Sequence, residues 1–187
     1  MADVRFDPSG FYEFNLAQGA VRTREGTRLV VLTEALAGRL LAAAAKAEGN
    51  TIIRKFGKAL GKQIVASAGD DASELPPEVV LGHATAVLAL FGWGRLSMER
   101  WGAALVLELS GGPDVDADRL VVAALLGGLL TVLAGRETAC VPVESSHFIV
   151  LDPTVAETVW SWSHGGQTRG QIVSRLEARL PTLVEEA

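Results

Sequence analysis

The stretch from Leu120 to Leu133 is apolar at nearly every position. A helix with this pattern has no solvent-facing side and must be buried all round. Asp116 or Asp118 precedes it and provides an N-cap, because a short carboxylate accepts hydrogen bonds from the free amides of a first helical turn. Gly127 and Gly128 lie in the middle of the stretch, where each costs about 1 kcal/mol relative to Ala. We therefore expect a buried central helix that another backbone approaches closely.

Apolar residues repeat with helical spacing in several further segments. Three precede the central helix, covering Thr33 to Glu48, Asn50 to about Ala66 and Glu78 to about Phe91, and two follow Asp152 and Thr168 near the C-terminus. The first helix should bury a face that holds Leu36, Leu40, Leu41 and Ala44. In the second, Gly57 and Gly61 share one side, which permits a close helix contact. That contact, or the apolar face of the same helix, is a candidate homodimer interface.

Two hairpins are predicted, the first from alternating apolar and polar residues and the second from two short apolar runs on either side of a turn. Leu96 to Arg100 and Ala103 to Leu109 flank a turn at Trp101-Gly102, and Thr138 to Val143 and His147 to Leu151 flank a Glu-Ser-Ser turn. Pro142 indicates an edge strand, whereas Val21 to Gly26 has the composition of a polar turn. The sequence therefore predicts an α+β fold, with a four-stranded antiparallel sheet packed against a layer of helices on one face.

Composition narrows the class of protein. The chain has 187 residues, 49% of them hydrophobic, a net charge of −5 and one cysteine. This size favours one domain, the acidic balance argues against a nucleic-acid partner, and a single cysteine excludes an internal disulfide. Asp3, Asp7 and Glu13 interrupt the region where a signal peptide would lie, and the longest uncharged run, Leu120 to Gly135, is shorter than the roughly 20 residues of a transmembrane helix. We expect a soluble, cytoplasmic domain.

Three stretches carry a resemblance to a known family. They are GTRLVVLTEALAGRLL with the following NTIIRKFGKALGKQI, then GWGRLSMERWGAALVLEL, and then LLGGLLTVLAGRETACVPVESSHFIV. Their order and spacing are similar to the 4-vinyl-reductase (4VR) domain family, whose fold is shared with the vesicle-tethering TRAPP subunits. The resemblance implies an N-terminal arm over residues 1–26, a 4VR-like domain over 27–164 and a helical extension over 165–187.

The resemblance also implies a function. Members of the family bind hydrophobic molecules or acyl chains, so we expect a non-catalytic, homodimeric regulatory module with no cofactor. One alternative is a TRAPP-like protein-interaction scaffold without a ligand, and another is an accessory or enzyme of a tetrapyrrole pathway. The expected ligand-binding residues are Phe56, Leu60, Leu88, Trp93, Leu126, Leu130, Cys140 and Phe148. Aromatic residues such as Trp101, Trp160, Trp162 and Phe91 suit either a pocket or a core.

Cys140 and His147 raise two further hypotheses. If they face each other across the second hairpin, they are candidates for a metal site, completed by His83 or His164, or for a nucleophile with its general base. The family resemblance places its first cysteine at Cys140, but no second cysteine follows, and the spacing is not that of a recognised zinc motif. We therefore expect no metal and no catalysis. Arg54, Lys58 and Lys62 share a helix face, which we interpret as a solvated surface and alternatively as a docking face for an anion.

Overall fold

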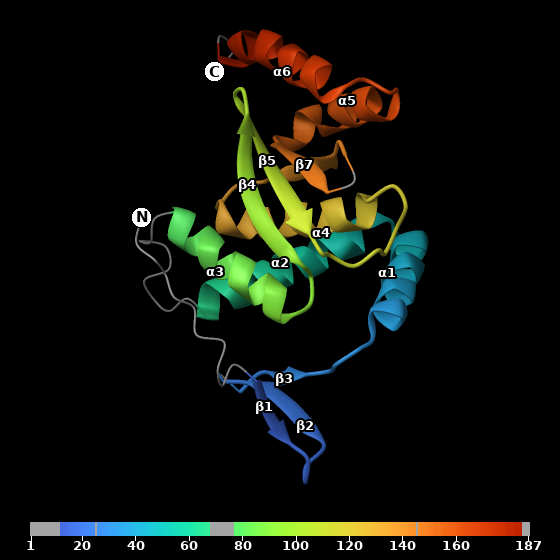
Figure 1. The fold of residues 1–187 in the computed structure, drawn as a ribbon, viewed down its shortest axis with the longest axis vertical. Coiled ribbons are helices and arrows are strands. Elements are labelled where there is room, and N and C mark those ends of the chain that lie inside the picture. Colours follow the sequence, from blue (N-terminus) through green and yellow to red (C-terminus); the bar gives the residue numbers. More distant parts are fainter. Residues whose placement is uncertain (1–11, 25, 68–76, 145, 185–187) are drawn as a thin grey trace.

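The computed structural model describes residues 12–24, 26–67, 77–144 and 146–184 (Figure 1). The predicted acidic loop with Asp70, Asp71 and Glu74 lies outside these ranges. The elements, in chain order, are β1 (Tyr12–Asn15), β2 (Ala20–Thr23), β3 (Arg28–Leu29), α1 (Glu34–Glu48), α2 (Asn50–Ser67), α3 (Pro77–Leu90), β4 (Arg95–Trp101), β5 (Ala104–Ser110), α4 (Leu120–Leu133), β6 (Ala139–Pro142), β7 (His147–Leu151), α5 (Pro153–His164) and α6 (Arg169–Val184).

The main sheet has four antiparallel strands in the order β4-β5-β7-β6. This confirms the predicted α+β class and both predicted hairpins. The strand β6 carries Pro142 and lies at the edge of the sheet, where a missing amide donor is tolerated. None of the helices in the described part of the chain combines the length and the apolar character needed to cross a membrane.

The helix α4 is the centre of the core, as its apolar pattern predicts. Nine of its residues are buried, and α2 packs against it at very close range. A Cβ atom added at Gly57 of α2 would lie 2.1 Å from the carbonyl oxygen of Leu125, and one added at Gly128 of α4 would lie 2.1 Å from that of Arg54. Gly57 and Gly61 therefore serve a contact within the chain. The prediction that this glycine pair forms a homodimer interface is wrong.

We predict that Gly57→Ala lowers the free energy of unfolding by about 3 kcal/mol, because its methyl group meets backbone that cannot move aside. Gly82→Ala in α3 is the matched control, because an added Cβ there meets no atom within 4 Å. The control should be neutral or stabilising by up to about 1 kcal/mol, the gain in helix propensity. Urea denaturation of both variants measures the difference. Equal stabilities would contradict the close contact.

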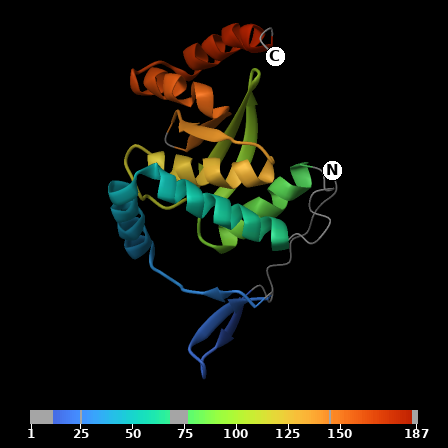
Figure 2. The ribbon, with the colours of Figure 1, turned by 180° about the vertical axis from the view of Figure 1, so that it is seen from behind.

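Helices cover both faces of the sheet, whereas the sequence predicted them on one face. On the inner face, Leu107, Leu109 and Phe148 pack with α2, α3 and α4. On the outer face, Trp101, Val106, Val141 and Ile149 pack with Val159 of α5 and Ile172 of α6, and Figures 1 and 2 show these two helices on the side of the sheet away from α4. The predicted division into an arm, a domain and an extension, with boundaries at residues 26 and 164, stays a prediction. Within the described structure, α6 of the predicted extension packs on the outer face of the sheet.

The N-terminal segment forms a small sheet of its own, in the order β1-β2-β3, which stands away from the main body (Figure 2). The prediction of a polar turn from Val21 to Gly26 is wrong, because β2 covers the first half of that segment. Its pairing with β1 and β3 outweighs the polar composition. Tyr12 anchors the sheet by donating a hydrogen bond to the carbonyl oxygen of Leu90 at 2.5 Å.

The bounds of α1 match the prediction, but its packing does not. None of its residues is buried. Leu41, Ala44 and Ala45 pack partly against the core, and Gly38 contacts Val115. Leu36 and Leu40, which were expected inside, are 39% and 54% exposed, because the body contacts the opposite side of this helix.

Candidate ligand-binding site

A cavity of about 410 Å³ lies where the hairpin of β4 and β5, the end of β7 and the helices α5 and α6 meet the end of α4. Its volume is in the range of small-molecule sites, about 300–1,000 Å³. Most of the lining is apolar and comes from Met98, Ala103, Ala104, Leu105, Leu107, Leu130, Ala134, Val150, Leu151, Val155, Val159, Trp162 and Leu176. The cavity can therefore enclose the hydrophobic body of a ligand.

The lining also includes five polar residues, which come from the loop between α4 and β6, from the N-cap of α5 and from the middle of α5. They are Arg136, Glu137, Thr138, Asp152 and Thr158. Asp152 is committed to capping α5, because its carboxylate accepts hydrogen bonds from the amide of Thr154 at 2.9 Å and from its hydroxyl at 2.7 Å. These bonds hold the pKa of Asp152 below its ordinary value. The lining thus combines a large apolar surface with a polar rim.

A network of charged side chains holds that rim in place. Arg54 of α2 donates hydrogen bonds to Thr131 at 2.9 Å, to Glu137 at 2.6 Å and to the carbonyl oxygen of Thr138 at 2.7 Å. Lys58, one turn further along α2, also pairs with Glu137. Arg54 and Lys58 therefore link α2 to the loop of the cavity. We interpreted this basic helix face as a solvated surface, and for Arg54 and Lys58 that interpretation is wrong, because both side chains bind Glu137.

We predict that the stability given by Glu137 depends on pH. Hydrogen bonds from Lys58 and Arg54 lower its pKa in the folded state. A carboxyl with a lowered pKa stabilises the fold above its ordinary pKa, and this contribution is lost as the pH falls through the folded value. Glu137→Gln should therefore lower the melting temperature at pH 7, by an amount that shrinks below about pH 4. Melting curves of both proteins measured across this range test it. A constant difference at every pH would contradict it.

The predicted ligand residues gather around the inner core. Leu60, Leu88, Leu126, Leu130 and Phe148 are buried there, and Trp93 and Cys140 pack against them. Phe56 is 43% exposed, with its ring centroid 6.1 Å from that of Trp93. Of these eight residues, Leu130 is the one that lines the cavity. Contact of the other seven with a ligand stays a prediction.

Cys140 and His147 lie on opposite faces of the sheet. Cys140 pairs with Val150 and packs against the inner core, whereas His147 contacts Trp101 of the outer face, with 5.1 Å between the centroids of the tilted rings. The two hypotheses that joined them, as metal ligands or as nucleophile and base, are therefore wrong. Burial also raises the pKa of Cys140 to about 12, so that its thiol is protonated at neutral pH and is a poor nucleophile.

Sequence reasoning missed most of the cavity, because its wall includes α5 and α6. The helical spacing after Thr168 predicts the last helix, whose apolar stripe includes Leu176, but the family resemblance implies that residues 165–187 are an extension beyond the main domain. The spacing of that stripe shows that the helix has a buried face. It does not identify the surface that the face covers.

Comparison with known proteins gives information about the fold alone. No protein-family model matches the chain, and no curated protein does. Among solved structures, the chain is similar to the phenol-responsive sensory domain of the transcription activator PoxR, crystallised with phenol. The TM-score is 0.61 at 12% sequence identity, and the match covers 82% of this chain and 92% of the other. The two chains share a fold.

Proposed function

We propose that this domain is a regulatory module that binds a small hydrophobic molecule in the 410 Å³ cavity. The observation that carries the proposal is the cavity itself, which has a mostly apolar lining, a few polar residues and a rim held by Arg54. The shared fold with a phenol-responsive sensory domain supports the same class of function. We also propose that the domain belongs to the 4-vinyl-reductase family. Its regulatory output would pass through a separate protein.

The cavity suits a monocyclic aromatic compound or a short acyl chain that carries one polar group. Burying an aromatic ring removes about 150–200 Å² of apolar surface from water, which is worth about 4–5 kcal/mol at 25 cal/mol per Å². This free energy corresponds to a dissociation constant near the millimolar range. A polar contact with the rim must supply any tighter binding. Thr158 and Thr138 are neutral groups there that can donate or accept a hydrogen bond.

We predict that phenol and short fatty acids raise the melting temperature, and that Thr158→Trp removes this effect by filling the cavity. Glu157→Trp is the matched control, because Glu157 is an exposed neighbour on α5 outside the lining. Thermal shift measurements test both variants, and native mass spectrometry of the purified protein identifies any retained compound. Ligand binding that is unchanged in Thr158→Trp would place the site elsewhere. No shift with either compound class, and no retained mass, would favour a scaffold.

We further propose that the domain acts as a homodimer through an apolar surface on its N-terminal part. Leu36 and Leu40 face away from the body, and the chain just before α1 exposes Val30, Val31 and Leu32 at 81%, 75% and 44%. Leu16, in the turn between β1 and β2, is 90% exposed as well, and large exposed apolar side chains of this kind are typical of interaction surfaces. A second copy of the chain is the proposed partner for this surface.

We predict that the double variant Leu36→Glu/Leu40→Glu is monomeric at concentrations where the parent is a dimer, because two buried charges at an interface are costly. Ala35→Glu/Ala42→Glu is the matched control. It adds the same charge to α1 at exposed positions on another side of the helix and should leave the dimer intact. Analytical ultracentrifugation measures the mass of each protein. A monomeric parent would contradict the proposal.

A further inference from the structure

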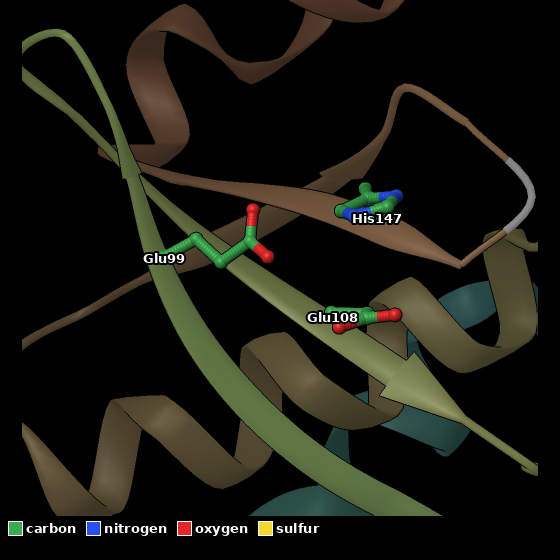
Figure 3. A group of neighbouring side chains, drawn as sticks. All are labelled: Glu99, Glu108 and His147. Carbon is green, nitrogen blue, oxygen red and sulfur yellow. The ribbon is translucent and has the colours of Figure 1, made fainter.

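Three potential metal ligands come together on the outer face of the sheet. Glu99 of β4, Glu108 of β5 and His147 of β7 have ligand atoms within 4.8 Å of one another, and Figure 3 shows their side chains grouped on neighbouring strands. The strand register explains this. Glu108 lies directly opposite His147 and opposite Ser97, two residues from Glu99 on the same side of β4. The three residues are distant in sequence, but they lie on adjacent strands and their side chains project from the same face of the pleated sheet.

Neither the Glu99 nor the Glu108 carboxylate is held by an ion pair within the described ranges. Neighbouring like charges on a sheet face destabilise it. Each carboxylate is positioned by a neutral donor. The indole of Trp101 donates to Glu99 at 2.9 Å, and the hydroxyl of Ser97 donates to Glu108 at 3.1 Å. An ionised carboxylate has about four acceptor positions, so each can still bind a cation.

The imidazole of His147 is oriented by its surroundings. Its Nδ1 lies 3.3 Å from a carboxylate oxygen of Glu144 and 3.3 Å from the hydroxyl of Ser146. The ring also packs against Trp101 at a tilted angle, and the guanidinium of Arg169 lies 3.6 Å from the centroid of the Trp101 ring. A carboxylate beside one ring nitrogen is the usual environment of a histidine that binds a metal through its other nitrogen.

We propose that Glu99, Glu108 and His147 bind a divalent transition metal ion of the Zn²⁺ type. Zinc accepts imidazole and carboxylate ligands in tetrahedral sites, and three protein ligands leave the fourth position for water. Calcium takes about six to eight oxygen ligands, more than this group provides. Bonds of about 2.0–2.2 Å require the ligand atoms to draw together. Glu99 can make this movement, because its side chain is exposed.

This site is separate from the cavity in its ligands and in its chemistry. It links three strands whose outer face also contributes Trp101 and Val106 to the core under α5. The bound ion therefore stabilises the sheet without contacting the hydrophobic ligand. The proposed ligands differ from those weighed in the sequence analysis, which paired His147 with Cys140 and led us to expect no metal.

Titration of chelator-treated protein tests the proposal, with Zn²⁺ followed by calorimetry and Co²⁺ followed by visible absorption. The expected result is one ion per chain, a higher melting temperature with Zn²⁺, and a Co²⁺ spectrum of nitrogen and oxygen ligands without thiolate absorption. Glu99→Gln and Glu108→Gln should each lower the affinity by at least about tenfold, and Glu144→Gln by about tenfold through the orientation of His147. Glu157→Gln, an exposed carboxylate elsewhere, and Cys140→Ser should leave the affinity unchanged.

Circular dichroism of the metal-free variants establishes that each is folded, and the exposed position of Glu99 makes Glu99→Gln the decisive variant. The proposal is overturned if the protein binds neither ion, if Glu99→Gln binds as tightly as the parent, or if Cys140→Ser abolishes binding. Response to phenol is measured on the same variants. Loss of metal with an intact response to phenol is expected, so that failure of the metal site and failure of the ligand cavity are distinguishable.

Discussion

The contact between α2 and α4 is the constraint on which the rest of the structure depends. A helix as apolar as α4 must be covered on every side, and the glycines at 57 and 128 let two backbones come together where any side chain would collide with a carbonyl group. This close contact brings Arg54 of α2 within reach of the loop that follows α4. The same packing that buries the central helix therefore also fixes the rim of the cavity.

The sheet separates two environments with different chemistry. Its inner face completes the core around α4 and includes Cys140, which is partly buried against that core. Its outer face is apolar under α5 and α6, and becomes polar where Glu99, Glu108 and His147 meet. The cavity lies at the end of the sheet, where residues from both faces contribute to its wall. One sheet can therefore support a hydrophobic site and a charged cluster that share no residue.

Two features of the N-terminal part bear on the proposed homodimer. Leu36 and Leu40 face away from the body, and the sheet of β1, β2 and β3 stands apart from it (Figure 2), with Tyr12 joining it to α3 by a hydrogen bond to Leu90. The proposed regulatory function requires that a change in the ligand site reaches the surface proposed for the homodimer. Coupling requires an element whose position both sites influence, and α2 is a candidate, because it contacts the cavity rim through Arg54 and contacts α1 at its N-terminal end.

The sequence by itself determined the elements and the class of fold. Periodicity placed α1 to α6 and both main hairpins, and the all-apolar pattern identified α4 as the buried centre, because these signals depend on local geometry and on burial alone. The tertiary structure decided which surfaces meet. It placed Gly57 against α4 instead of a second chain, put Cys140 and His147 on opposite faces, and grouped Glu99 with Glu108 and His147. Such pairings depend on strand register and on helix packing between distant segments, and no local pattern of residues specifies them.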